Sequence, residues 1–183
     1  MTVPGRALDN QDCLINQLHS KFPEALLIHR LDMDTSGVMI FARSSFAQKN
    51  LAKAFEQRKI KKKYVAWVNG IIEDDEGEID LPIRKDTQQS LPPKHVVDFE
   101  HGKRSITKWN VSKRNDLVTR LDLYPLTGRS HQLRVHLKEI GHPIIGDPIY
   151  GARKERMLLH AEKLCFNHPV YDTWLELESV APF

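Results

Sequence analysis

The chain has 183 residues, of which 40% are hydrophobic and 28% are charged, a composition typical of a globular domain and too apolar for a disordered one. No apolar run approaches the roughly 18 residues of a membrane-spanning helix, and the first residues lack the basic-then-apolar pattern of a secretory signal. Two cysteines, Cys13 and Cys165, are too few for a metal cluster or a disulfide framework, which favours a reducing cytoplasm.

The 27 Lys and Arg residues and 24 Asp and Glu residues give a net charge of +3, but the charges are unevenly distributed. Residues 41–70 contain eight basic residues and one Glu, a net charge of +7. Residues 71–80 contain six acids and no base, a net charge of −6, and residues 101–138 contain nine bases and two Asp, again +7. Basic blocks of this kind bind the phosphates of nucleic acids, although a charged run is more often a solvated face.

The hydrophobic spacing predicts two helices and three strands in residues 10–70. In chain order, these are a short helix capped by Asn10 or Asp12 and ended near Pro23, buried strands at 25–28 and 38–42 around a polar turn at 32–37, a helix from Ser44 or Ser45 to about Gln57, and a strand at 64–68 closed by Asn69-Gly70.

The rest of the chain is predicted to consist mostly of strands. The expected elements are strands at 79–83, 105–111, 117–124, 157–166 and 174–178, a polar loop at 84–103, and a helix capped by Ser130 that runs to Ile140. Strands and helices show few clean alternations, and no repeat or linker is evident. We therefore predict an α+β fold with a largely antiparallel sheet, as a single domain over residues 1–183.

A first candidate site is the segment HRLDMDTSG at 29–37, in which a strand leads through a basic pair to Asp32. A carboxylate can act as a nucleophile or general base, and a neighbouring cation favours its ionised form. The alternative is a structural turn in which Asp34, Thr35 and Ser36 satisfy local backbone groups. The resemblance of DTSG to the active turn of aspartic proteases is weak, because the spacing differs and no second copy exists.

Two further segments are candidates. Residues 127–136 (TGRSHQLRVH) predict a glycine turn before a helix, where free N–H groups could meet a phosphate, although an ordinary amphipathic helix explains the same pattern. Tyr64 follows the basic run 58–63 and could stack on a base or move a proton, or simply pack in a strand. The spacing of His131 and His136 does not suit a zinc site, and the glycine fingerprints of nucleotide-binding enzymes are absent.

Three motifs occur in one order: HRLDMDTSG at 29–37, KYVA at 63–66 and GRSHQLR at 128–134. GHPIIGDPIYG at 141–151 and LLHA at 158–161 follow them. Together they resemble the RluA family of pseudouridine synthases over nearly the whole chain. The resemblance implies a mixed, mainly antiparallel sheet with flanking helices and a central RNA-binding cleft, no S4 RNA-binding domain, and conversion of uridine to pseudouridine without cofactor or metal.

The resemblance also implies site residues. Asp32 matches the family's catalytic aspartate, Tyr64 its active-site tyrosine and Arg134 the arginine that pairs with the aspartate, while Arg30 matches a residue that replaces the flipped nucleotide. Either Leu158 or Leu159 is expected to pack under the uracil. The substrate-binding residues expected from the same motifs are His29, Arg30, Thr35, Arg129, His131, Gln132 and Leu159.

The implied substrates are a loop of 23S rRNA, a tRNA anticodon stem-loop, or both, bound by a monomer with no membrane partner. The alternative function is a non-catalytic RNA-binding module that uses the same basic cleft; a carboxylate-dependent hydrolase lacks a second well-placed acid. Relatives in the family begin with a further strand that carries an Asn-Lys-Pro-x-Gly motif. Because Met1 nearly adjoins Val3-Pro4-Gly5, we expect that strand to be absent.

Overall fold

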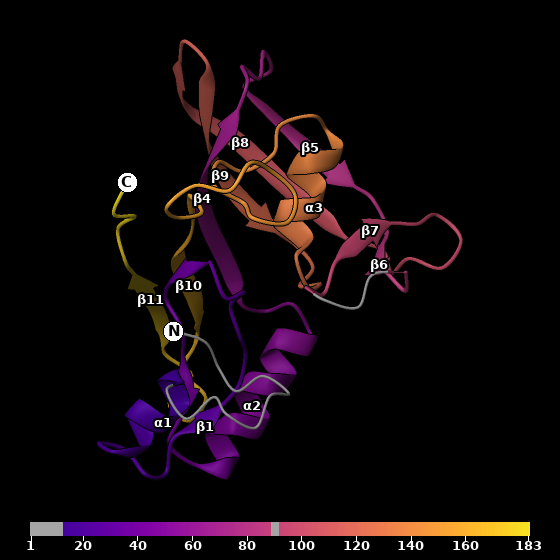
Figure 1. Cartoon of the computed structure of the whole chain (residues 1–183). Coiled ribbons are helices and arrows are strands. Elements are labelled where there is room, and N and C mark those ends of the chain that lie inside the picture. Colours follow the sequence, from indigo (N-terminus) through magenta and orange to yellow (C-terminus); the bar gives the residue numbers. More distant parts are fainter. Residues whose placement is uncertain (1–12, 89–91) are drawn as a thin grey trace.

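The computed structural model describes residues 13–88 and 92–183 and shows an α+β fold (Figure 1). The helices within these residues are α1 (Leu14–His19), α2 (Ser45–Glu56) and α3 (Gln132–Glu139). The strands are β1 (Leu26–Leu27), β2 (Ser36–Gly37), β3 (Phe41–Ala42), β4 (Lys61–Asn69), β5 (Glu76–Asp80), β6 (Ile83–Lys85), β7 (His95–Val97), β8 (Ile106–Asn115), β9 (Val118–Pro125), β10 (Leu159–Asn167) and β11 (Trp174–Glu178). None of these helices is long and apolar enough to cross a bilayer.

A seven-stranded sheet forms the centre of the molecule. Six strands follow the order β11-β10-β4-β9-β8-β5, and each pairs with its neighbours in antiparallel fashion. The short β2 pairs with β10 in parallel. Strands β1 and β3 form a separate antiparallel pair, as do β6 and β7. The predicted mixed, mainly antiparallel sheet is therefore confirmed.

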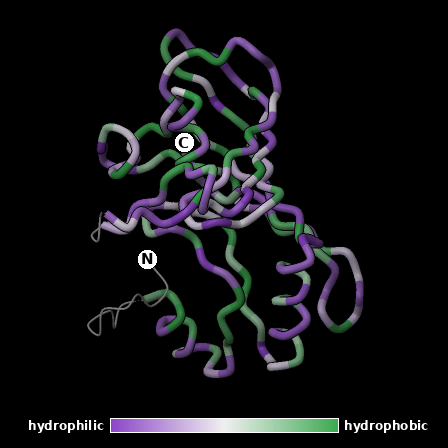
Figure 2. The backbone as a smooth tube through the Cα atoms, turned by 90° about the vertical axis from the view of Figure 1, so that its right-hand side faces the viewer, coloured by the Kyte–Doolittle hydropathy of each residue, from purple (hydrophilic) through white to green (hydrophobic). Residues whose placement is uncertain are grey.

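Two apolar clusters hold the helices against this sheet. Leu133 and Leu137 of α3 pack with Ala66, Leu121 and Leu123 of β4 and β9, all of them buried. The second cluster joins α2 to the far end of β10. Figure 2 shows α1 and α2 at the same end of the molecule, each with both hydrophilic and hydrophobic segments. This packing leaves the face of β4 between α2 and α3 as the floor of the site described below.

Most predicted strands are present, and so is the predicted helix 45–57, whose N-cap Ser44 accepts a hydrogen bond from the N–H of Ala47 at 3.2 Å. The prediction of segment 84–103 as a loop is wrong, because β6 extends into it as far as Lys85 and pairs with β7, which lies within it. The predicted buried strand 25–28 is reduced to two residues, and Leu27 is exposed since β1 belongs to a two-stranded sheet rather than to the core.

Helix starts were predicted less well than helix bodies. Helix α1 has Cys13 as its N-cap, with no capping side-chain hydrogen bond; the predicted caps Asn10 and Asp12 lie outside the described residues, as does the expected loss of a strand before Val3. The predicted cap Ser130 is also wrong. The N-cap position of α3 is held by His131, which makes no side-chain capping hydrogen bond and has a left-handed backbone with φ of 55°.

Gly37 holds the chain close to β10. Its φ is +124°, and a Cβ at this position would overlap the backbone of Ala161, which pairs with Gly37 across the parallel contact. We predict that Gly37→Ala lowers the free energy of unfolding by at least about 3 kcal/mol, measured by urea denaturation. Gly141→Ala is the matched control: φ is +86° but nothing lies within 4 Å of the new Cβ, so its cost should stay near 1 kcal/mol. Equal losses would contradict the close-approach explanation.

Candidate active site

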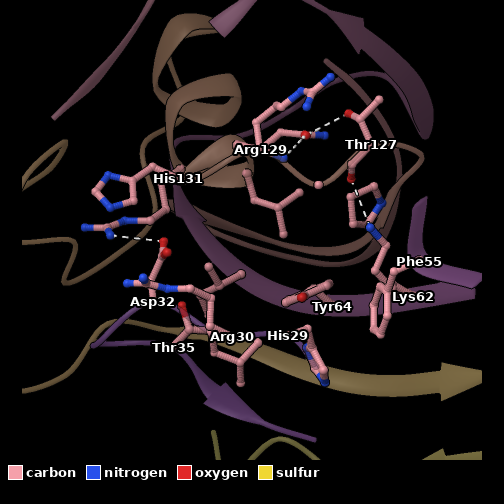
Figure 3. Close-up of a pocket in the computed structure, with 17 residues that line it drawn as sticks. His29, Arg30, Asp32, Thr35, Phe55, Lys62, Tyr64, Thr127, Arg129 and His131 are labelled. Atoms are coloured by element: carbon pink, nitrogen blue, oxygen red, sulfur yellow. Dashed lines mark hydrogen bonds and ion pairs between the residues drawn. The ribbon is translucent and has the colours of Figure 1, made fainter. Parts of the chain in front are cut away.

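All ten residues predicted for the site line one cavity of about 320 Å³. This volume lies within the range of roughly 300–1,000 Å³ found for small-molecule sites. Figure 3 shows the cavity with the segment 29–35 on one side, Tyr64 of β4 as part of its wall, and the turn 127–129 and His131 opposite. The contributing residues extend from His29 to Leu159 in the sequence, so the fold brings the separate motifs to one place.

Asp32 faces a buried arginine. Nη1 of Arg134 donates to Oδ2 of Asp32 at 3.3 Å, and the Asp32 side chain remains 23% exposed, whereas that of Arg134 is 2% exposed. The turn that carries Asp32 is closed by a hydrogen bond from the N–H of Thr35 to the carbonyl oxygen of Asp32 at 3.0 Å. The carboxylate is thus held at the cavity surface with a fixed cation behind it.

Asp147 is the site-supporting residue that sequence reasoning missed. Its carboxylate accepts from Nε and Nη2 of Arg134, each at 2.8 Å, and from the N–H groups of Ile149 and Tyr150. Burial acts to lower the pKa of Arg134, but the hydrogen bonds and charge of Asp147, together with Asp32, outweigh it and raise that pKa. Asp147 therefore leaves Nη1 as the guanidinium edge that reaches Asp32. The motif at 141–151 contained this residue, but nothing in the motif indicated its partner.

Two residues form apolar walls of the cavity. Tyr64 is half-buried on β4, and burial together with the charge of Asp32 raises the pKa of its hydroxyl to about 12. The phenol is therefore protonated at neutral pH. Leu159 of β10 also lines the cavity, whereas Leu158 does not, which favours Leu159 of the two leucines as the residue that could contact a base.

His29 and His131 are neutral histidines in this cavity. Burial and the charge of Lys62 lower the pKa of His29 to about 4, and its Nε2 accepts the N–H of Ile40 at 3.0 Å. Burial, opposed by Asp32 and reinforced by Arg134, lowers the pKa of His131 to about 4. The Nδ1 of His131 lies 2.8 Å from the hydroxyl of Tyr150. Both rings thus act in the folded protein as neutral hydrogen-bonding groups at pH 7.

We predict that stability falls on acidification between pH 6.5 and 4. In this interval the unfolded histidines, with a pKa near 6.5, bind protons that the folded rings do not, so protonation favours unfolding. Each ring should lower the free energy of unfolding by on the order of 3 kcal/mol at pH 4 and should have no effect above about pH 7.5. The measurement is the free energy of unfolding from urea denaturation, at several pH values in this range, for the wild type and for His29→Gln. If this free energy depends on pH equally steeply in both proteins, His29 does not cause the loss of stability.

Gln132 organises the turn that forms one wall. Its Oε1 accepts from Oγ1 of Thr127 at 2.7 Å and from the N–H of Arg129 at 3.0 Å, and its Nε2 donates to the carbonyl oxygen of Ile106 at 3.0 Å. The side chain is buried, with these atoms already engaged. Direct contact of Gln132 with substrate stays a prediction, while its hydrogen bonds explain the shape of the turn.

Some bases of the two basic blocks form ion pairs with acids, whereas others line the cavity. Three bases of the block 101–138 pair with the acidic block 71–80 because β5 and β8 are neighbours: Arg104 with Asp80, Lys108 with Glu78 and Arg114 with Asp75. On β4, alternation turns Lys62 toward the cavity, whereas Lys63 forms ion pairs with Asp122 and Glu162. These pairs take up only part of the basic blocks. Lys62 of the first block and Arg129 and Arg134 of the second line the cavity together with Arg30, and binding of RNA phosphates by the blocks stays a prediction.

Comparisons with known proteins agree with this geometry. The family model "RNA pseudouridylate synthase" matches residues 2–139. The chain is 43% identical to the dual-specificity RNA pseudouridine synthase RluA of Yersinia pestis, covering 100% of this chain and 91% of that protein. It is 40% identical to the protein of the same name from Escherichia coli strain K12, covering 100% and 85%.

The fold agrees as well. The human RNA Pseudouridylate Synthase Domain Containing 1 structure matches with a TM-score of 0.83 at 31% identity, covering 100% of this chain and 80% of that one. These matches favour the enzyme over the non-catalytic RNA-binding module. The chain therefore belongs to the RNA pseudouridylate synthase family, in which it is an RluA-like pseudouridine synthase.

Proposed function

We propose that this enzyme isomerises uridines in a 23S rRNA loop and in a tRNA anticodon loop, with Asp32, Tyr64 and Arg134 as its catalytic residues. The observation that carries the proposal is the pairing of Asp32 with the buried Arg134 at the surface of a cavity that all the predicted site residues line. The relatives' description as dual-specificity enzymes supports two RNA substrates. We further propose that the chain acts in the cytoplasm as a single-domain monomer, without cofactor or metal.

The reaction breaks the bond between N1 of uracil and C1′ of the ribose, turns the base and joins C5 to C1′. The hydrogen on C5 is lost and N1 gains one, so substrate and product contain the same atoms. An anionic group is needed beside the sugar and C6, whether it adds covalently or assists formation of a glycal. Asp32 is the carboxylate that faces the cavity, and Arg134 holds it in place.

The uridine must leave the RNA stack before it can reach this carboxylate. Extrusion of a base costs a few kcal/mol, less in a loop than in a duplex. Arg30 lies exposed at the cavity rim, where its guanidinium can occupy the space the base vacates. Leu159 and Tyr64 supply the apolar contacts for the extruded uracil, and the neutral His29 and His131 keep the wall polar without adding charge.

Tyr64 is proposed to stack on the uracil and to take part in removal of the C5 proton. Because its pKa is about 12, the hydroxyl can accept that proton only while it passes its own to a neighbour or to water. We predict that Tyr64→Phe lowers kcat by about 10²- to 10⁴-fold with KM nearly unchanged, since general acid–base catalysis contributes on that order and the ring remains. Tyr124→Phe is the control, because Tyr124 lies on β9 and does not line the cavity. An unchanged kcat in Tyr64→Phe would contradict a role of the hydroxyl in proton removal and would leave only stacking of the ring on the uracil.

The substrate assignment is tested by mapping pseudouridines in rRNA and tRNA from a strain that lacks the gene. We expect one site in each RNA class to revert to uridine, and both sites to return when the wild-type gene is restored. If a pseudouridine disappears from only one of the two RNA classes, dual specificity is contradicted. If none disappears from either class, the whole substrate assignment is contradicted.

A further inference from the structure

A second cavity, of about 450 Å³, adjoins the first and shares part of its wall. The shared residues are Phe55, Lys62, Thr127, Gly128 and Arg129. Figure 3 shows Lys62 and Phe55 at one end of the first cavity, with Lys62 directed toward Thr127. Arg58 lines the second cavity but not the first. The two cavities are thus immediate neighbours, so an RNA whose uridine fills the first has its adjoining backbone close to the second.

The second cavity is cationic. Its lining contains Arg58, Lys62 and Arg129 against one carboxylate, Glu56. Within residues 13–88 and 92–183, none of the three cations forms an ion pair with a carboxylate. The ammonium of Lys62 instead donates to the carbonyl oxygen of Thr127 at 3.0 Å.

Lys62 is the most constrained of these cations. Burial and the neighbouring charge of Arg58 lower its pKa to about 8, the direction expected for a cation that lacks an anionic partner. Proteins normally pair charges that they remove from water. Gly128 contributes no side chain here, and a Cβ at that position would stand 3.6 Å from Nζ of Lys62. Because Lys62 lines both cavities, an anion bound in either of them would lie beside this ammonium.

Arg58 stands in a backbone conformation that suits glycine. It follows the C-cap Gln57 of α2, its φ is +57°, and the N–H of Lys59 donates to the carbonyl oxygen of Ala54 at 2.9 Å, which completes the turn that ends the helix. Glycine is the residue that most often occupies this position, since side chains strain a left-handed backbone. An arginine here therefore points to a use for its side chain that offsets the strain.

We propose that Arg58, Lys62 and Arg129 form a subsite for the phosphodiester backbone of the RNA, next to the cavity that receives the uridine. The inference rests on the proposed function, because it places the extruded nucleotide in the first cavity. The phosphates on either side of that nucleotide lie within one nucleotide's length of its base. Arginine and lysine are the side chains that bind such oxygens, arginine through its planar fork and lysine as a point charge.

The test couples a protein change to a single phosphate of the RNA. Dissociation constants are measured for an anticodon stem-loop RNA in which methylphosphonate, which is uncharged, replaces one linkage at a time around the target uridine. Arg58→Gly removes the cation while giving the left-handed position a better-suited residue, so its melting temperature should not fall below that of the wild type. Arg58→Gln provides a second variant with a long side chain, and Lys49→Gln removes an exposed cation of α2 that lines neither cavity.

We expect Arg58→Gly and Arg58→Gln to weaken binding of the unmodified RNA on the order of tenfold and to reduce the salt slope of log Kd by about 0.7, and Lys49→Gln to do neither. One methylphosphonate linkage should cost the wild type about tenfold and the Arg58 variants clearly less. Equal costs in wild type and variants at every linkage, or wild-type binding by both variants, would overturn the subsite. These measurements read binding alone, whereas release of the C5 hydrogen by the wild type tests the proposed function, so either can fail without the other.

Discussion

Asp32→Asn is expected to abolish pseudouridine formation, with a loss of at least about 10³-fold in the single-turnover rate. The amide retains the size of the carboxylate and can still accept from Arg134, so the turn and its hydrogen bond from Thr35 should persist. What disappears is the anion that either chemical route needs beside the sugar. The measurement is release of tritium from RNA labelled at C5 of uridine, with the RNA affinity determined in parallel and expected to change little.

Asp34→Asn is the matched control for this experiment. Asp34 lies in the same turn, carries the same charge and is exposed, but it does not line the cavity that contains Asp32. We expect it to release tritium at nearly the wild-type rate. If Asp32→Asn and Asp34→Asn behave alike, the loss reflects the charge of the turn rather than a carboxylate in the cavity, and the assignment of Asp32 fails.

Asp147→Asn is expected to damage both stability and catalysis although Asp147 does not line the cavity. The carboxylate is fully buried and makes two hydrogen bonds to a guanidinium that is itself almost fully buried. Removing one partner of a buried pair typically costs about 3–5 kcal/mol, and Arg134 would keep only its longer contact with Asp32, at 3.3 Å. An asparagine also places an amide group against the guanidinium, which frees Arg134 to turn away from Asp32. We therefore expect kcat to fall at least tenfold at temperatures where the variant is folded.

Asp80→Asn is the control for Asp147→Asn, because it removes an aspartate that pairs with an arginine at an exposed position. Asp80 also receives two donors from one guanidinium, that of Arg104, but both side chains are substantially exposed. Exposed pairs contribute about 0–1 kcal/mol. Urea denaturation should therefore show a loss of at most about 1 kcal/mol for Asp80→Asn and unchanged kcat. A similar loss for both variants would show that burial of the Asp147 pair is not what matters.

The sequence was sufficient for the family, the sheet and the surroundings of the cavity. In β9, buried Leu121 and Leu123 alternate with polar Arg120 and Asp122, so the local pattern is enough to predict the strand. The motif residues of the site are predictable for another reason. They are ordered along the chain as in the RluA family, and the structure gathers all ten around one cavity.

Long-range pairing accounts for most of what was not predictable. Ser36 and Gly37 look like turn residues and become a strand because β10, more than a hundred residues later, pairs with them. Strand order likewise decides which charges neutralise one another, since the acids of β5 meet the bases of β8. The same holds for the partner of Arg134. The two hydrogen bonds that its guanidinium donates to the buried carboxylate of Asp147 result from packing, and no spacing in the sequence predicts them.

The central claim is that a uridine in RNA becomes pseudouridine in the cavity that contains Asp32. The most direct test incubates the purified chain with the anticodon stem-loop and with the 23S rRNA hairpin, both labelled with tritium at C5, and counts released tritium and pseudouridine in the same sample. One tritium should be released for each pseudouridine formed, with Asp32→Asn giving neither. Absence of both products from the wild type on both RNAs, or undiminished release by Asp32→Asn, would contradict the account.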